Sequence, residues 1–321
     1  MSITSKIAAA LLIIFAALVG AAWLILQTSV RPSFERQEMA AHELNRARVE
    51  ANLAAVADGM RARVLDYARW DDSYRFFQGR NSTYIRTNFI SPHWLRDYGA
   101  DLAIFLDNEG RPLWSRQRNG DTTTSAQAGV ISAAFTQVRG LDGVGALTGT
   151  LWTDAPSPII FAAARATRSD GTGTAIGYVI YGRYLDPTVL AQQTQLDVEI
   201  TTKAGAARTW TRGDHLYSLI PLTDAHGDTI IGGVVARSDR TFAALGASSI
   251  EIATTLLAFV FAAALFAVWF SLRHVVVARL QRMERHFSAQ ADTATPMAPD
   301  HGNDEIAGLT AAYNALAERV A

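Results

Sequence analysis

The stretch that decides the architecture is IAAALLIIFAALVGAAWLIL, residues 7–26, which contains no charged residue. As an α-helix, a run of this length spans about 30 Å, the thickness of the hydrocarbon core of a bilayer. A cleaved signal peptide is the alternative, with the small residues Gly20, Ala21 and Ala22 as weak cleavage candidates. Because the apolar core of a signal peptide is usually about 7–15 residues long, the length favours an uncleaved membrane anchor.

A second uncharged stretch, IATTLLAFVFAAALFAVWFSL, covers residues 252–272. A buried core helix is the alternative, but this length and apolar purity favour a second membrane span. Lys6 precedes the first span, and four arginines follow the second: Arg273, Arg279, Arg282 and Arg285. Since Lys and Arg gather on the cytoplasmic side of a membrane, both termini are expected inside and the long middle region outside.

The two spans divide the chain into five expected segments. A cytoplasmic N-terminus covers residues 1–6, and the first transmembrane helix covers residues 7–27. An extracytoplasmic domain follows at residues 28–248, and the second transmembrane helix lies at residues 249–272. Residues 273–321 form a cytoplasmic relay. The expected location is therefore a bacterial inner membrane, with the lipid bilayer as a partner and the large domain in the periplasm.

The composition narrows the classes of function. Hydrophobic residues make up 49% of the chain and charged residues 18%, which favours a folded protein over a disordered one. The net charge of −1 gives no basic field that would attract nucleic acid. Cysteine is absent, which excludes disulfides, thiol catalysis and cysteine-based zinc sites.

The region after the first span is rich in Ala, Glu, Arg and Leu, and contains no proline between Pro32 and Pro92. Residues 34–66 therefore predict a long helix that begins near Pro32. We expect this helix to continue through DYARWDDSYRFFQG, residues 66–79, and to stop at Gly79. One face of the continued helix would then carry Tyr67, Trp70, Asp71 and Tyr74.

From Asp101 onward, short apolar runs bounded by Gly, Asn and Asp predict strands joined by tight turns. Strands are expected in residues 101–106, 111–115, 157–167, 174–186, 197–202, 207–213, 215–224 and 229–239, and helices in residues 125–138 and 187–195. Since the connections are short, the sheets should be mostly antiparallel. The expected fold class is α+β, with a long N-terminal helix that carries one or two small antiparallel-sheet modules.

The stretch YARWDDSYRFF, residues 67–77, resembles the signature of the fourth subtype of CHASE-type extracellular sensory domains. Further agreement lies in residues 88–114 and in residues 158–186, which end in Gly-Arg-Tyr-Leu-Asp. The resemblance covers about residues 40–195 and implies PAS- or Cache-like modules. It also implies a membrane receptor that feeds a diguanylate cyclase, a cyclic-di-GMP phosphodiesterase, a kinase or a chemotaxis-type output. It supplies no ligand.

Three roles remain open for the Trp-Asp-Asp stretch. Aromatic residues at helical spacing most often form core, and the aspartates would then bond to backbone of the next loop. A cage for a cationic ligand such as an amine is the second role, through cation–π and ion-pair contacts, and a dimer contact is the third. Arg165 and Arg183 lie in predicted strands, where they would pair with the helix carboxylates, bind an anion or stay on the surface. The candidate ligand site consists of Tyr67, Trp70, Asp71, Asp72, Tyr74 and Arg183.

After the second span, two segments carry the apolar seam of a coiled coil on either side of a connector with Pro296 and Pro299. The first seam is Val276, Leu280, Met283 and Phe287, and the second is Ile306, Leu309, Tyr313 and Leu316. This arrangement resembles a HAMP linker domain, as do Asp304, Glu305 and Asn314, although Val275–Val277 stand where the family usually has a proline. The resemblance implies a helical bundle formed by a homodimer. A plain dimerising coiled coil is the alternative.

Sequence motifs for catalysis are lacking. The chain contains no GxxxxGK[ST] loop, no GxSxG elbow and no HExxH helix. It also lacks the Gly-Gly-Asp-Glu-Phe and Glu-Ala-Leu signatures, and His93, His215 and His226 have no metal-ligand spacing. We therefore expect no catalytic residue, metal or cofactor in these residues.

The expected function is a receptor that senses an unknown small extracytoplasmic ligand and relays it to a cytoplasmic output, first of all cyclic-di-GMP signalling. The output module is expected after Ala321, fused or separate. The alternatives are the sensor portion of a histidine kinase or chemotaxis-type receptor, and an adaptor that contacts a periplasmic binding protein.

Overall fold

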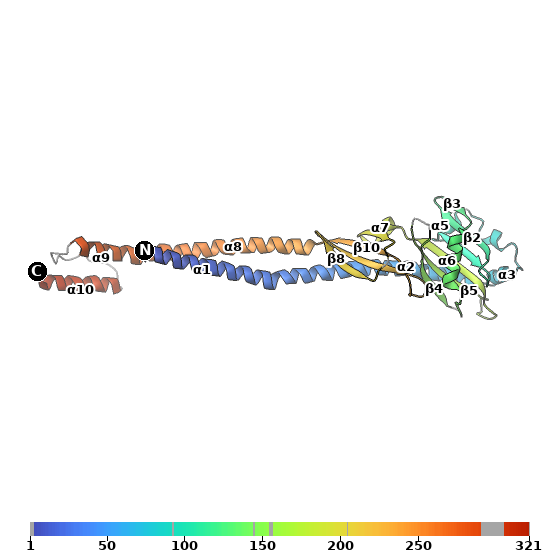
Figure 1. Cartoon of the computed structure of the whole chain (residues 1–321), viewed down its shortest axis with the longest axis horizontal. Coiled ribbons are helices and arrows are strands. Elements are labelled where there is room, and N and C mark those ends of the chain that lie inside the picture. The colour runs from blue at the N-terminus through green and yellow to red at the C-terminus, as the bar shows by residue number, and fades with distance from the viewer. Residues whose placement is uncertain are drawn as a thin grey trace. The chain divides into compact units, whose positions relative to one another are not determined.

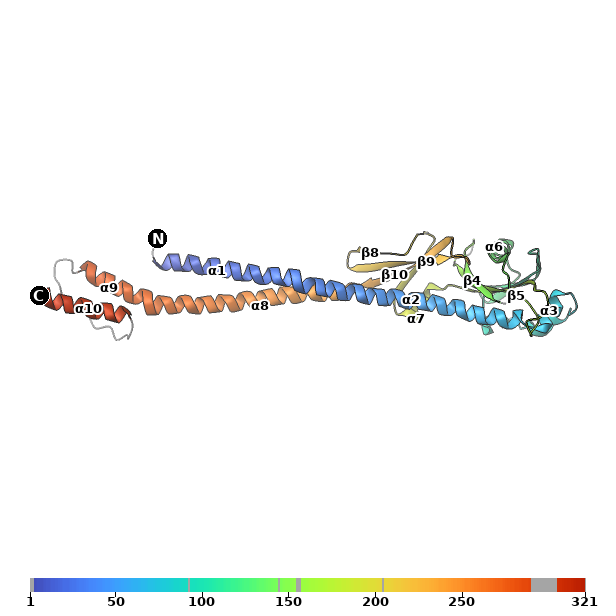
Figure 2. The ribbon, with the colours of Figure 1, turned by 90° about the horizontal axis from the view of Figure 1, so that it is seen from below.

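The structure is a computed structural model that describes residues 3–91, 93–143, 145–153, 157–203, 205–289 and 305–320 (Figures 1 and 2). The chain divides into two compact units. One unit is Glu38–Arg240, and the other combines Met1–Gln37 with Thr241–Ala321.

Three helical segments follow one another without a break at the start of the chain. They are α1 (Ile3–Ile25), the π-helical η1 (Leu26–Val30) and α2 (Arg31–Ala68). The Arg31 N–H donates to the carbonyl of Leu26, five residues earlier, which is the wider π-helical pattern. The long helix therefore does not begin near Pro32, as expected, but runs through it. Pro32 directly follows η1, so the wider π-helical turn stands where the proline removes a backbone N–H.

The prediction that the long helix continues to Gly79 is wrong. The helix α2 ends at Ala68, Trp70 is extended with φ −125° and ψ 130°, and a new helix, α3, covers Asp71–Phe77. At this break the Ala68 carbonyl accepts a hydrogen bond from Thr167 N at 2.8 Å, directly after the distant strand that ends at Ala166. Tyr67, Trp70, Asp71 and Tyr74 therefore do not share one helix face. Gly79, with φ 72°, follows the end of α3 instead.

Six strands form the first sheet, in the order β3-β2-β1-β6-β5-β4, and every pair is antiparallel. They are β1 (Leu102–Leu106), β2 (Pro112–Asn119), β3 (Thr122–Thr124), β4 (Ala146–Leu151), β5 (Ile159–Ala166) and β6 (Ile176–Tyr184). Side chains alternate along β1, so that Ala103 and Phe105 enter one core and Ile104 enters the other. Burial on both faces explains why β1 is an uninterrupted apolar run.

Different helices cover the two faces of this sheet. The core that contains Phe105 is closed by the end of α2, by α3 and by the short helices α4 (Tyr84–Asn88) and α5 (Trp94–Asp97). The core that contains Ile104 is closed by α6 (Ala128–Val138), which presents Val130, Ala134 and Val138. Each of these residues is four positions after the one before it, and together they form the apolar stripe of an amphipathic helix.

Four strands form the second sheet, in the antiparallel order β7-β10-β9-β8. They are β7 (Asp197–Thr201), β8 (Arg208–Arg212), β9 (His215–Thr223) and β10 (Ile230–Asp239), and α7 (Pro187–Thr194) precedes them. Val49 of α2 and Leu190 of α7 pack with Ile220 and Val234 in a third core. The unit Glu38–Arg240 therefore contains two sheets, and both sheets pack on α2.

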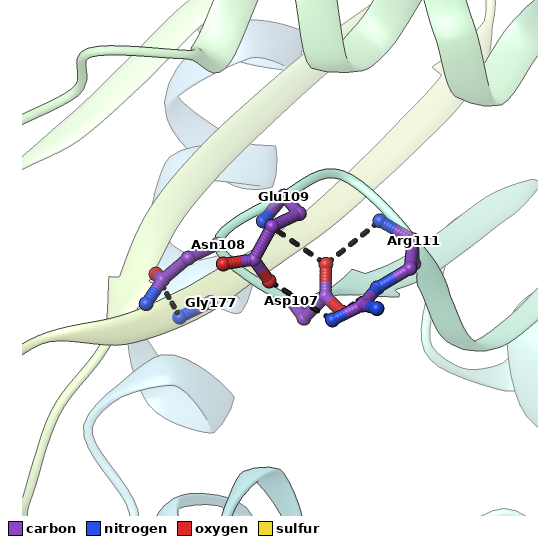
Figure 3. A network of polar contacts seen from close by, with 5 residues as sticks. All are labelled: Asp107, Asn108, Glu109, Arg111 and Gly177. Atoms are coloured by element: carbon purple, nitrogen blue, oxygen red, sulfur yellow. Dashed lines mark hydrogen bonds and ion pairs between the residues drawn. The ribbon is translucent and has the colours of Figure 1, made fainter.

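The turn between β1 and β2 is tied to β6 by side-chain hydrogen bonds (Figure 3). The Asp107 carboxylate accepts from Arg111 N at 2.8 Å and from Arg111 Nε at 2.6 Å. Asn108 Oδ1 accepts from Gly177 N at 2.9 Å, where β6 has an irregular register. Gly177 has φ 62°, and a Cβ at this position would collide with the carbonyl oxygen of Leu106, so this bulge requires glycine.

The other unit holds the two membrane-span candidates. Besides α1 it contains α8 (Thr241–Leu272), the π-helical η2 (Arg273–Val277), α9 (Ala278–Ala289) and α10 (Glu305–Val320). The helices that contain α1 and α8 each carry an apolar 18-residue stretch, long enough to cross a membrane, of which no part is buried. Leu12 and Phe259 are 70% and 73% exposed, an apolar surface that suits lipid better than water.

The expected α+β class is thus confirmed, with its long N-terminal helix, antiparallel sheets and two candidate membrane helices. The short strands β3 and β4 and the helices α4 and α5 were not predicted.

Candidate functional site

The predicted aromatic residues lie in a large cluster on one face of the first sheet. Tyr67 is at its centre, with ring centroids 5.3 Å from Tyr98, 5.7 Å from Tyr181 and 5.9 Å from Trp70. Most of these contacts are edge-to-face, the favoured arrangement of aromatic pairs. We define the aromatic cluster as Tyr67, Trp70, Phe76, Phe77, Tyr84, Phe89, Trp94, Tyr98, Phe105, Trp114 and Tyr181.

Some polar atoms in and beside the aromatic cluster have a hydrogen-bond partner, and others do not. The hydroxyls of Tyr84 and Ser73 are 2.5 Å apart and share a hydrogen bond. The Tyr181 hydroxyl and Trp114 Nε1 are buried and have no partner within the described residues. Burial raises the pKa of Tyr181 well above its usual value, so this hydroxyl remains a neutral donor.

The predicted carboxylates lie outside the aromatic cluster and bind to nearby protein groups. Asp71 is exposed, and its carboxylate accepts from Ser169 N at 3.0 Å while its own N–H donates to the Ser169 hydroxyl at 3.1 Å. Asp72 lies 3.5 Å from Arg75 in an exposed ion pair. The Tyr74 hydroxyl donates to the carbonyl of Thr174 at 3.1 Å. The cation-binding role of these residues stays a prediction.

Arg183 lies apart from the other predicted site residues. It follows Tyr181 by two positions on β6 and lines a cleft of about 510 Å³. The walls come from α2, from the ends of β2 and β6, and from α7. Asn52, Val56, Asp101, Arg118 and Gln193 also line this cleft. The structure therefore divides the predicted site into three parts. Tyr67 and Trp70 lie in the aromatic cluster, and Arg183 lines the cleft. Asp71, Asp72 and Tyr74 lie outside both, with local partners.

The cleft contains one ion pair. Asp101 is only 5% exposed, and its carboxylate accepts from Arg118 Nε and from Tyr184 N, the latter at 2.8 Å. The hydrogen bond to Asp101 raises the pKa of the Arg118 guanidinium. The two side chains are therefore each other's partners within the cleft.

A buried histidine is a feature that the sequence interpretation missed. His42 of α2 is 2% exposed, and its two ring nitrogens lie 2.7 Å from Ser238 Oγ and 2.8 Å from Ser218 Oγ. Burial lowers its pKa, so the neutral imidazole is favoured. His42 precedes the buried Val49 by seven residues, a spacing that places both on one helix stripe and could have revealed it.

The predicted relay residues fall in η2, α9 and α10. Val276 is half-buried, Leu280 and Leu309 are exposed, and Met283 is buried with its sulfur 3.9 Å from the hydroxyl of Thr310 on α10. Tyr313 is half-buried in α10. Asp304 lies outside the described residues, as do the side chains of Phe287, Glu305, Ile306 and Leu316. The HAMP prediction therefore stays a prediction.

Residues 52–201 match the family model of the CHASE4 domain. No curated protein matches the chain by sequence. The extracellular domain of the protein vpHK1S-Z8 is similar in structure, with a TM-score of 0.46 and 11% identity, over 65% of this chain and 97% of that chain.

Two further solved structures are similar at comparable levels. The sensor domain of the Vibrio cholerae histidine kinase DctB has a TM-score of 0.42 and 10% identity, over 64% of this chain and 98% of that chain. The ligand-binding domain of the Campylobacter jejuni chemoreceptor Tlp3, in complex with L-valine, has a TM-score of 0.40 and 9% identity, over 67% and 98%. The likeness to the CHASE4 domain family thus lies in residues 52–201 of this chain.

Proposed function

We propose that this chain is a transmembrane receptor whose CHASE4 domain senses an extracytoplasmic cue and relays it to a cytoplasmic output. The observation that carries the proposal is the position of the CHASE4 match, residues 52–201, between two helices that could each cross a membrane. The residue ranges of the five expected segments and the inside location of both termini belong to this proposal. The excess of arginines after α8 supports that orientation.

Continuity of the chain supports signal transfer. One helix runs from Ser5 to Ala68 and so joins the first span to the sensory domain. At the other end, β10 stops at Asp239 and α8 begins at Thr241. Rigid elements that leave the sensor directly would pass a ligand-induced shift on as movement of one span against the other.

The relay proposed after the second span is a HAMP-type bundle in a homodimer. Support comes from the exposed apolar positions Leu280 and Leu309 on α9 and α10, which a second chain would cover. The buried contact between Met283 and Thr310 joins the two helices within one chain. Two packings of such a bundle would give the relay its two signalling states.

Cyclic-di-GMP metabolism is the output that we propose first, and kinase or chemotaxis outputs are the alternatives. The test measures cellular cyclic-di-GMP with the protein expressed from its own gene, either unchanged or with Ile306→Asp. A charge in the predicted seam should abolish the effect of the protein on the nucleotide level, because carboxylates are not tolerated at the centre of a bundle. Ala311→Asp, on the exposed side of the same helix, is the matched control and should leave the effect intact.

Two outcomes would contradict parts of this proposal. If Ile306→Asp and Ala311→Asp leave the same nucleotide level as the unchanged protein, the relay is wrong. If the nucleotide level never depends on the protein but phosphoryl transfer or swimming behaviour does, a kinase or chemotaxis output replaces cyclic-di-GMP. Membrane fractions must contain equal amounts of each variant for either comparison.

A further inference from the structure

The cleft of about 510 Å³ at the end of β6 combines polar side chains that have no partner. Arg183, Asn52 and Gln193 line it from three different elements, β6, α2 and α7. Within the parts of the chain that the structure describes, none of these three side chains makes a hydrogen bond or an ion pair. Arg183 and Asn52 are half-buried and Gln193 is exposed, so the cleft presents unpaired polar groups that an external partner can reach.

Both carboxylates that line the cleft already accept hydrogen bonds from other groups, and neither is paired with Arg183. Asp101 accepts from Arg118 and Tyr184, as described above. Asp186 caps α7, where its carboxylate accepts from Thr188 N at 2.8 Å. Arg183 is half-buried and receives no carboxylate. The cleft therefore offers one guanidinium whose donors are free to bind an anion.

The remaining walls indicate the size and character of that anion. Leu185 and Leu190 are 5% and 1% exposed and form part of an apolar lining, together with Val56 and Val189. The volume falls within the range of small-molecule sites, about 300–1,000 Å³. A single planar guanidinium matches the two oxygens of a carboxylate, whereas phosphate sites usually gather several cations. The amides of Asn52 and Gln193 would orient the bound group.

We propose that this cleft is a binding site for a small organic carboxylate with an apolar body, held through Arg183. The site is separate from the aromatic cluster, and it lies where α2 and α7 meet the end of β6. Since α2 continues into the first span, occupancy would act on the helix that leads to the membrane. The proposal rests on the proposed function only in that it names the class of ligand which the receptor senses. Binding itself is measured without any output, so the two proposals can fail separately.

The test measures binding of butyrate and hexanoate to the full chain in lipid nanodiscs, by calorimetry and thermal shift. Butanamide and hexanamide, the neutral isosteres, are the ligand controls. The carboxylates should bind and the amides should not, and Arg183→Gln should weaken carboxylate binding about tenfold or more, as expected for loss of a charge-assisted pair. Arg212→Gln, an exposed arginine on β8 outside the cleft, should leave binding unchanged.

A second variant guards against a misfolded Arg183→Gln protein. Asn52→Asp keeps the size of the side chain and places a negative charge in the cleft, which should also weaken carboxylate binding. Binding of none of the carboxylates, equal binding of acids and amides, or unchanged affinity in both cleft variants would each overturn the proposal. Suppose that Arg183→Gln loses carboxylate binding while Ile306→Asp leaves the output unchanged. That result would support the binding site and contradict only the relay.

Discussion

At the scale of single residues, His42 joins the first helix of the sensory region to the second sheet. Its imidazole lies between Ser238 of β10 and Ser218 of β9, and the Ser218 hydroxyl lies 3.3 Å from that of Thr209 on β8. A neutral imidazole suits this chain of hydroxyls, since one nitrogen donates and the other accepts. Burial has the largest influence on its pKa and lowers it, whereas the charge of Glu43 raises it by less, so protonation is disfavoured while the protein is folded.

This arrangement predicts a pH-dependent stability. The pKa of His42 is lowered in the folded state from its ordinary value of 6.5, so the unfolded chain takes up a proton that the folded chain refuses. The free energy of unfolding should therefore fall as pH drops below about 6.5, by at most about 1.4 kcal/mol per pH unit from this one group. Above that pH both states are neutral and the effect vanishes. Urea denaturation followed by tryptophan fluorescence, from pH 8 to pH 5, measures it.

The substitution His42→Gln isolates this contribution, because glutamine can bond to both serines but does not titrate. The difference in stability between the unchanged protein and His42→Gln should shrink or reverse toward pH 5. His226→Gln, an exposed histidine in the turn between β9 and β10, is the matched control and should run parallel to the unchanged protein at every pH. Parallel curves for His42→Gln would show that His42 is not the titrating group.

At the scale of elements, strands that are apolar on both faces were predicted from the sequence, as were half-exposed strands such as β7 and β8, but the edge strands β3 and β4 were not. The runs in β1, β5 and β6 are long and apolar because both of their faces enter cores. β4, with the sequence ALTGTL, lies at the edge of the first sheet, and its half-buried residues gave no such run. The α+β class, the turns and α7 followed from local signals that act within a few residues.

The end of α2 shows why the candidate site was predicted only in part. Nothing local interrupts the helix at Ala68, and the hydrogen bond at the break comes from Thr167, 99 positions further along the chain. The residues around Trp70 were correctly grouped as aromatic, but their common helix face was lost with the break. The cleft could not be predicted either, because Asn52, Arg183 and Gln193 come from three elements and no short motif contains them.

The start of α3 carries a prediction of its own. Asp71 and Ser169 exchange two hydrogen bonds that hold α3 against the turn after β5. Asp71→Ala leaves Ser169 N without its acceptor and should lower the free energy of unfolding by about 1 kcal/mol. Asp72→Ala is the matched control, one residue along the same helix, and should cost less than about 0.5 kcal/mol, because it removes only an exposed ion pair. Urea denaturation gives both values, and equal losses would mean that the bonds to Ser169 add nothing.

At the scale of the whole molecule, each candidate span ends in a π-helical segment. η1 follows α1 at Leu26–Val30, and η2 follows α8 at Arg273–Val277. Such segments shift the helix register by a fraction of a turn, and they often mark positions where helices adjust. The segment η2 also holds Val275–Val277, the place where a HAMP linker usually has its proline, so a π-helical widening lies at that position.

The orientation of the chain in the membrane is the last prediction, and the lack of cysteine makes it simple to test. Lys203→Cys and Arg285→Cys each introduce a single thiol at an exposed position, one between β7 and β8 and one in α9. If the arginines after α8 keep that end inside, a membrane-impermeant maleimide should label Lys203→Cys in cells with a permeabilised outer membrane, and label Arg285→Cys only after detergent is added. A permeant maleimide, which should label both variants in intact cells, controls for thiol reactivity. Labelling of Arg285→Cys before detergent would place α9 outside and would remove the basis for a cytoplasmic relay.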